Sequence, residues 1–224
     1  MIGAIDAERV DELWSLGDVV GYGPHPDECC RLVSSRASLA LAGNHDLGVL
    51  GTLDLADFAP DALESALWTR NVLSESSRAW LAGLSSSGSR AGVELYHASP
   101  RDPVWEYVLS GGQALDALQQ TAAPVVLVGH SHVPLSIVLT DGKLSGGVVG
   151  EGHEEQLARG RLLLNPGSVG QPRDGDPRAS FLLLDLDEGL AQFHRVAYAV
   201  ERTQADLRKL ALPDALAARL THGV

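Results

Sequence analysis

The stretch "LAGNHDLG", residues 41–48, places three polar side chains in a row on a glycine-flanked turn. Asn44, His45 and Asp46 follow an apolar run that is typical of a buried strand. An amide oxygen, an imidazole and a carboxylate can each bind a metal ion, and the last two can also move a proton. A turn of this kind at the end of a buried strand predicts a functional site in an α/β protein.

The composition indicates a protein with a sizeable hydrophobic core. The chain has 224 residues, of which 45% are hydrophobic, and we expect a single domain spanning residues 1–224. Its 17 basic and 29 acidic residues give a net charge of −12, which argues against nucleic acid as a partner because phosphate backbones attract basic surfaces. The same charge argues against a membrane surface, and the longest apolar runs are too short to span a bilayer.

Two further features indicate a cytoplasmic protein. The first residues do not show the basic start and apolar stretch of a secretory signal. The two cysteines are the neighbours Cys29 and Cys30, which do not make a disulfide framework or a zinc knuckle. We therefore expect them to be helix residues in a reducing compartment.

Strand-like and helix-like segments alternate along the chain, which predicts an α/β fold. Strands are expected within residues 11–18, 37–46, 92–100, 124–129 and 160–168, and hairpins over 135–145 and 178–198. Helices are expected within residues 25–36, 54–83, 112–121 and 205–220, the second and fourth interrupted at Pro60 and Pro213. The serine-rich segment 85–89 is interpreted as a solvated loop, and residues 51–90 and 139–160 as the segments that shape the substrate site.

Four of the predicted strands end in turns that carry side chains able to bind a metal ion. In chain order these residues are Asp18, Asn44, His45, His97, His130 and His132. Because sites in open α/β sheets gather at the carboxyl ends of strands, we expect these side chains to converge. A set of carboxylate, amide and imidazole ligands suits manganese, iron, nickel or zinc better than calcium, which prefers oxygen alone.

Five motifs occur in order along the chain: "GDVVGYGP", "GNHD", "YHASP", "GHSHVP" and "NPGSVGQPRDGDPRAS". Together they resemble the calcineurin-like metallophosphoesterases, in particular the small prokaryotic phosphodiesterase branch, from about residue 11 to the tail. The resemblance implies a four-layer α/β/β/α sandwich of two mixed sheets. It also implies hydrolysis of a phosphorylated small-molecule substrate, a phosphomonoester or phosphodiester, with two bridged metal ions.

The resemblance assigns a role to each matching position. Asp18 would bridge the two ions, and His132 would bind the first ion. The remaining protein ligands of the second ion would be Asn44, His97 and His130. His45 would be the catalytic histidine, placed beside the ions without binding them.

Three further residues lie in the same loops and keep more than one interpretation. Asp46 would orient the His45 imidazole, or it would simply occupy a helix N-terminal position. Arg173 would bind a substrate phosphate with its two-pronged guanidinium, or it would pair with Asp174 or Asp176. Tyr22 is placed with Arg173 among the substrate-binding residues because of its position beside the predicted site.

Other conspicuous side chains are interpreted as structural. A single histidine is more often a core or surface residue than a ligand, and four lie outside the motifs: His25, His153, His194 and His222. The tryptophans are expected to pack in the core or at the rim of the site: Trp14, Trp68, Trp80 and Trp105.

One motif of the family has no counterpart in this chain. The family opens with a strand that ends in Asp-x-His and supplies two ligands to the first ion, whereas this sequence contains no Asp-x-His. Residues 1–10 look like the end of the helix that follows that strand, so we expect the first strand to be missing through a truncated start and the sheet to contain a gap. The first ion would then keep Asp18 and His132, with His25 as the first candidate for a substitute ligand.

Two functions therefore stay open on the sequence. One is a metal-dependent phosphoesterase that activates water with two ions. The other is a catalytically silent protein that holds one ion or none and binds a phosphorylated ligand or a partner.

Overall fold

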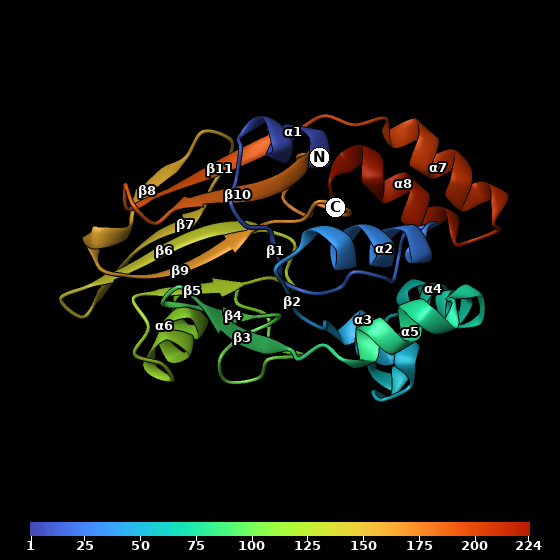
Figure 1. Cartoon of the computed structure of the whole chain (residues 1–224), viewed down its shortest axis with the longest axis horizontal. Helices are drawn as coiled ribbons and strands as arrows, with labels where there is room; N and C mark the ends of the chain where they lie inside the picture. The colour runs from blue at the N-terminus through green and yellow to red at the C-terminus, as the bar shows by residue number, and fades with distance from the viewer.

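A six-stranded mixed sheet forms the centre of the structure, a computed structural model that describes all 224 residues (Figure 1). The strand order is β3-β4-β5-β9-β6-β7. The three neighbours β4, β5 and β9 run parallel, and the remaining pairs are antiparallel. The strands are β3 (Ser87–Arg90), β4 (Val93–Tyr96), β5 (Val125–Val128), β6 (Pro134–Thr140), β7 (Lys143–Val148) and β9 (Arg161–Pro166).

Two smaller sheets accompany the central one. Strands β1 (Trp14–Ser15) and β2 (Leu39–Ala40) form a parallel pair, and β8 (Glu154–Gln156), β10 (Ala179–Asp185) and β11 (Leu190–Val196) form an antiparallel sheet in the order β10-β11-β8. A single parallel bridge joins Leu41, after β2, to Ser85, before β3. The predicted α/β class is confirmed, and the β-structure outside the central mixed sheet lies in two separate pieces.

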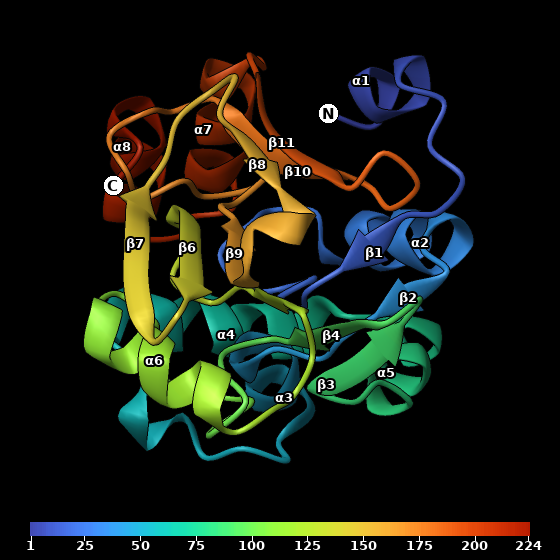
Figure 2. The same cartoon turned by 90° about the vertical axis from the view of Figure 1, so that its left-hand side faces the viewer.

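The sheets and one helix pack in layers, as Figure 2 shows with α6 and β10–β11 on opposite sides of the central sheet. Helix α6 (Gly111–Gln119) covers one face of that sheet with a small apolar cluster. The three-stranded sheet covers the other face through Phe193 and Ala191 of β11. The central residues of this inter-sheet core are Leu95, Leu127, Val138, Leu162 and Leu164. Burial of these side chains from both sides fixes the central sheet in place.

Most of the remaining helices gather at one end of the sheets, on the right of Figure 1: α2 (Pro26–Arg36), α3 (Asn44–Leu50), α4 (Pro60–Val72), α5 (Glu75–Ala82), α7 (Val200–Lys209) and α8 (Asp214–His222). Helix α1 (Ile2–Ala7) lies apart from them at the top of the view, and two short 3-10 turns, η1 (Leu55–Asp57) and η2 (Leu157–Arg159), precede α4 and β9. Helices α3, α4 and α5 share one apolar cluster with Val20. No helix combines the length and the hydropathy needed to cross a membrane.

Most of the predicted elements form near their predicted positions. Both hairpins are present, and Asp141 and Gly142 turn the first with φ of +51° and +73°. The break at Pro213 separates α7 from α8 as predicted. Pro60 does not interrupt a helix but starts α4. At the first helical position the backbone N–H has no partner within the helix, so its absence in proline costs no hydrogen bond. The break in that region falls instead at Leu73 and Ser74.

Two local predictions are wrong. The segment interpreted as a solvated loop contains the start of β3, which pairs along its whole length with β4. Cross-strand hydrogen bonds outweigh the weak strand propensity of serine and glycine there. The turn at residues 44–46 is the first turn of α3, with Gly43 as its N-cap. An acidic residue three positions after the N-cap, here Asp46, is the local signal for that start.

The inter-sheet core gives a direct test of this layering. Phe193 is 2% exposed and lies between the two sheets, so Phe193→Ala should lower the free energy of unfolding by roughly 3–5 kcal/mol. The matched control is Leu186, which lies just after β10 and is 42% exposed. Leu186→Ala should change the free energy of unfolding by about 0.5 kcal/mol or less. Chemical denaturation monitored by circular dichroism measures both. Equal losses in the two variants would contradict the packing of β11 against the central sheet.

Candidate metal centre and active site

The turn after β1 directs Asp18 toward the predicted ligands. Asp18 has a left-handed backbone with φ of +52°, and its side chain is only 13% exposed. Gly17 before it also has positive φ, and a Cβ there would lie 2.7 Å from the Gly43 nitrogen and 2.8 Å from Nδ1 of His97. Only glycine leaves room for this approach of three segments. Burial disfavours the charge on Asp18, yet the surrounding imidazoles, His97 first, hold its pKa below the ordinary value.

The start of α3 and the Asp18 turn hold each other through two carboxylates. Oδ1 of Asp18 accepts the backbone N–H of His45 at 2.9 Å. The carboxylate of Asp46 accepts the N–H groups of Val20 at 3.0 Å and Val19 at 3.2 Å. Each segment therefore satisfies backbone donors of the other, which fixes the distance between the turn and the helix.

Asp46 is fully buried and also caps its own helix. It accepts the N–H of Gly43 at 2.9 Å and makes no hydrogen bond to the His45 imidazole. Of its two interpretations, the geometry corresponds to the helix N-terminal one. Burial, followed by the nearby charge of Asp18, raises the pKa of Asp46 to about 7.

His97 brings the third strand end into the site. It is 1% exposed, and its Nδ1–H donates to the carbonyl oxygen of Leu16 at 2.7 Å. Its Nε2 lies 3.6 Å from Oδ2 of Asp18 and 3.2 Å from Oδ1 of Asn44. An imidazole nitrogen, a carboxylate oxygen and an amide oxygen this close together are a set of atoms that could hold a cation.

His130 completes this group from the turn after β5. Its backbone is left-handed, with φ of +60°, and both of its ring nitrogens are buried without a hydrogen-bond partner. Burial lowers the pKa of His130 to about 4, so its imidazole is neutral and can donate a lone pair. One ligand atom each from Asp18, His97 and His130 lies within 4.8 Å of the others.

His132 enters the site from the same turn, also with φ of +60°. Its Nδ1–H donates to the carbonyl oxygen of Gln171 at 2.8 Å, and no protein group engages Nε2. Burial, followed by the charge of Arg173, lowers its pKa to about 3. The buried Asn165 holds the turn by donating to the carbonyl oxygen of Gly129 at 2.8 Å, a role that sequence reasoning missed although Asn165 stands in a quoted motif.

These side chains meet at a cavity of about 290 Å³. The predicted residues that line it are Asp18, Tyr22, Asn44, His45, His130, His132 and Arg173, while His97 lies buried behind it. The lining that sequence reasoning did not assign to the site is Asp57, Phe58, Ala59, Ala62, Trp105 and Tyr107. Residues 57–62 fall within the first of the two segments expected to shape the substrate site, whereas residues 139–160 contribute nothing to this lining.

Arg173 reaches the cavity without a carboxylate partner. Its Nη2 donates to the hydroxyl of Tyr22 at 3.2 Å and to the side-chain oxygen of Gln171 at 2.9 Å. The alternative pairing with Asp174 or Asp176 does not form, because both aspartates pair with other arginines. Burial raises the pKa of Tyr22, so its phenol stays protonated. A guanidinium and a phenol thus remain available to an anion.

His45 lies inside a small aromatic enclosure at the same cavity. It is 4% exposed, and its ring centroid lies 4.3 Å from that of Tyr22 and 5.0 Å from that of Phe58. Its Nδ1 is buried and has no partner, and burial lowers the pKa of the imidazole.

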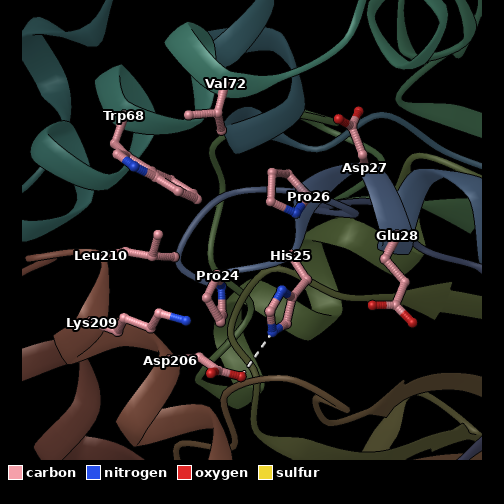
Figure 3. Close-up of a pocket in the computed structure, with 10 residues that line it drawn as sticks. All are labelled: Pro24, His25, Pro26, Asp27, Glu28, Trp68, Val72, Asp206, Lys209 and Leu210. Carbon is pink, nitrogen blue, oxygen red and sulfur yellow. Dashed lines mark hydrogen bonds and ion pairs between the residues drawn. The ribbon is translucent and has the colours of Figure 1, made fainter.

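A larger cavity of about 450 Å³ lies between α2, α4 and α7 (Figure 3). His25 points there to Asp206, and its Nε2 lies 3.0 Å from the carboxylate. His25 is therefore not placed as a substitute ligand. The larger cavity contains none of the converged ligands, so the smaller cavity is the candidate active site.

Comparison with known proteins identifies the family of the chain. The sequence model of the calcineurin-like phosphoesterase superfamily domain matches residues 1–189, and the chain belongs to that superfamily. It is therefore a hydrolase that acts on phosphoester bonds, which confirms the family predicted from the five motifs.

Several relatives cover much of the chain. The crystal structure of a metallophosphoesterase from Sphaerobacter thermophilus is 40% identical with a TM-score of 0.88, over 99% of this chain and 91% of that one. An uncharacterised protein of Methanocaldococcus jannaschii, MJ0912, is 33% identical over 100% of this chain and 91% of its own length. A symmetrical bis(5'-nucleosyl)-tetraphosphatase of Nitrosococcus oceani is 30% identical over 44% of this chain and 37% of its own length.

The contact between Gly43 and Asp18 yields a test of the metal centre. The backbone of Gly43 suits any residue, but a Cβ there would overlap the Asp18 carboxylate. Gly43→Ala should therefore displace that carboxylate and weaken the affinity for Mn²⁺ at least about tenfold. Gly112→Ala on α6, where the nearest atom is 3.9 Å away, is the control and should bind manganese normally. Isothermal titration with Mn²⁺ measures both. Normal manganese binding by Gly43→Ala would remove Asp18 from the ligand set.

Proposed function

We propose that this phosphoesterase hydrolyses small phosphorylated molecules with the help of a divalent metal ion held by Asp18, Asn44, His97 and His130. The observation that carries the proposal is the convergence of these ligand atoms beside a cavity that also presents the unpaired Arg173. A metal-ligand group and a free guanidinium at one cavity suit a phosphate ester better than a neutral substrate.

The donor set supports a transition metal. The group combines carboxylate, amide and imidazole donors, and the two orphaned nitrogens of His130 lack any partner within the protein. Manganese, iron, nickel and zinc accept such a set, whereas calcium prefers oxygen ligands alone. When bound, the ion supplies Lewis-acid polarisation of the phosphoryl group.

The protein groups around this centre have separable roles. Arg173 and the Tyr22 phenol bind and orient the phosphate oxygens, because both present donors at the cavity. His45 is the neighbour of the ligand Asn44 in the sequence but does not bind the ion itself. It stabilises charge on the leaving oxygen or passes a proton to it. The aromatic side chains around His45 keep bulk water away from that proton.

The position of the family's first ion is only half furnished in this chain. Asp18 and His132 are the two ligands that the family resemblance assigns to it, and the free Nε2 of His132 suits that role. The family's two further ligands, on the Asp-x-His turn, have no counterpart in the 224 residues. The second candidate function is a protein that holds one ion at Asp18, Asn44, His97 and His130 and binds a phosphorylated ligand without hydrolysing it.

The substrate class has support from one relative. The Nitrosococcus protein is named for a nucleotide substrate, and it shares 113 aligned residues with this chain at 30% identity. A phosphorylated small molecule is therefore the class of substrate that we propose.

Removal of metal separates the two candidate functions. Chelation should abolish hydrolysis of bis(p-nitrophenyl) phosphate, and Mn²⁺ should restore it better than Ca²⁺ because imidazoles contribute to the ligand set. The assay is run beside elemental analysis of metal per chain. Bound metal without hydrolysis would favour the ligand-binding function, and recovery with calcium alone would contradict the imidazole ligands.

Replacement of His45 tests the proton-transfer role. His45→Ala should lower kcat for the same diester by ~10²-fold or more, because a group beside the leaving oxygen is lost and no metal ligand is. His222→Ala, an exposed histidine at the end of α8, is the control and should leave kcat unchanged. Metal content is measured for both variants. An unaltered kcat in His45→Ala would exclude the residue from the mechanism.

A further inference from the structure

The loop between β4 and α6 holds two aromatic side chains, Trp105 and Tyr107, at the candidate active site. The loop is closed by its own hydrogen bonds. Oγ of Ser99 accepts the N–H of Asp102 at 3.1 Å, and the Asp102 carboxylate accepts the N–H of Trp105 at 3.1 Å. Val108, 3% exposed, anchors the end of the loop in the core under α6. The two rings are thus presented by a preorganised segment.

Tyr107 has one covered face and one accessible side. Its ring stacks on His130 with centroids 4.0 Å apart and planes at 24°. The residue is nevertheless 40% exposed, and its hydroxyl has no hydrogen-bond partner in the protein. His130 covers one face of the ring, and the residue as a whole still keeps two fifths of its surface exposed. Most exposed apolar side chains need no explanation, but this one lines the active-site cavity.

The rest of the cavity wall continues the same surface. Ring centroids follow one another from Tyr22 to His45 at 4.3 Å, to Phe58 at 5.0 Å and to Trp105 at 5.5 Å. Tyr22 and His45 offer polar atoms to the phosphate, whereas Phe58 offers no hydrogen-bond donor and is not needed to bind a phosphate alone. The rings meet at angles of 53° to 79°, so they form an aromatic wall that suits an aromatic part of the substrate.

We propose that Tyr107, supported by Trp105, stacks on a planar heteroaromatic group of the substrate of the size and chemistry of a nucleobase. The proposal rests on the proposed function, since Arg173 holds the phosphate of the same molecule. Asp57 lines the cavity with an exposed carboxylate that has no bonded partner, and it offers an acceptor to the hydroxyl or amino donors that a nucleoside carries. The loop formed by residues 99–108 is thereby the element that determines substrate preference.

Two ligands that differ only in the base test this inference. Adenosine 5'-monophosphate and ribose 5-phosphate share the sugar and the phosphate, and their dissociation constants are measured by calorimetry with the manganese-loaded protein. The nucleotide should bind about tenfold more tightly or better, because stacking of a base on an aromatic ring adds to affinity whatever the base. Tyr107→Ala should remove this preference and leave the affinity for ribose 5-phosphate unchanged, whereas Tyr107→Phe should keep it.

The matched control is Leu109→Ala, on the chain just beyond the loop. Leu109 is 58% exposed and does not line the cavity, so the preference should persist. Tyr107→Leu keeps an apolar contact with His130 without a planar face, and it replaces the alanine variant if that variant loses structure.

The remaining outcomes each decide the matter. Equal affinities of the unaltered protein for the two ligands would overturn the proposal. Equal weakening of both ligands in Tyr107→Ala, with reduced manganese binding, would also overturn it by showing that the ring only orients His130. A preference for the nucleotide without any phosphoester hydrolysis would support the stacking surface and reject the proposed function. Hydrolysis without that preference would support the proposed function and reject the stacking surface.

Discussion

The site depends on two carboxylates, the half-buried Asp18 and the buried Asp46, each of which accepts backbone N–H groups from the segment that carries the other. Asp18 accepts a backbone N–H from the first turn of α3, and Asp46 in that turn accepts two from the segment after Asp18. Buried backbone donors must find partners, and here each partner belongs to the other segment. The same exchange sets Asp18 against Gly43, places Asn44 beside His97 and orients the helix that carries His45.

The convergence of the ligands requires a strained backbone at three of the ligand positions. Asp18, His130 and His132 all have φ between +50° and +60°, a region that costs residues other than glycine about 1–3 kcal/mol each. The surrounding structure determines these conformations through bonds to main-chain atoms. Asn165 fastens the turn around His130, and the carbonyl oxygen of Gln171 fixes the ring of His132. The strain therefore lies where the ligands must point inward from strand ends.

The sequence predicts those parts of the fold and the site that depend on local pattern. Hydrophobic period and turn residues predict the hairpins, and ligand-type residues after successive strands predict their convergence. Strand β3 could not be predicted in this way, because Ser87–Arg90 has no hydrophobic alternation and owes its strand to pairing with β4. Tyr107 was missed for a related reason, since its contact with His130 depends on how a whole loop folds. The absence of a carboxylate partner for Arg173 was likewise not predictable from the sequence, because it depends on the pairing of Asp174 with the distant Arg195 and of Asp176 with Arg178.

The self-contained loop after β4 has a consequence for how such a protein diverges. Its internal bonds run from Ser99 and Asp102 to neighbouring amides, and none of them is needed to shape the turns around Asp18 or His132. Substitutions at positions 104–107 leave the hydrogen bonds that support Asp18 and His132 in place, although Tyr107 itself contacts the ring of His130. Lineages that inherit one catalytic scaffold can therefore acquire different substrates through a short, replaceable segment, while the chemistry stays under separate constraint.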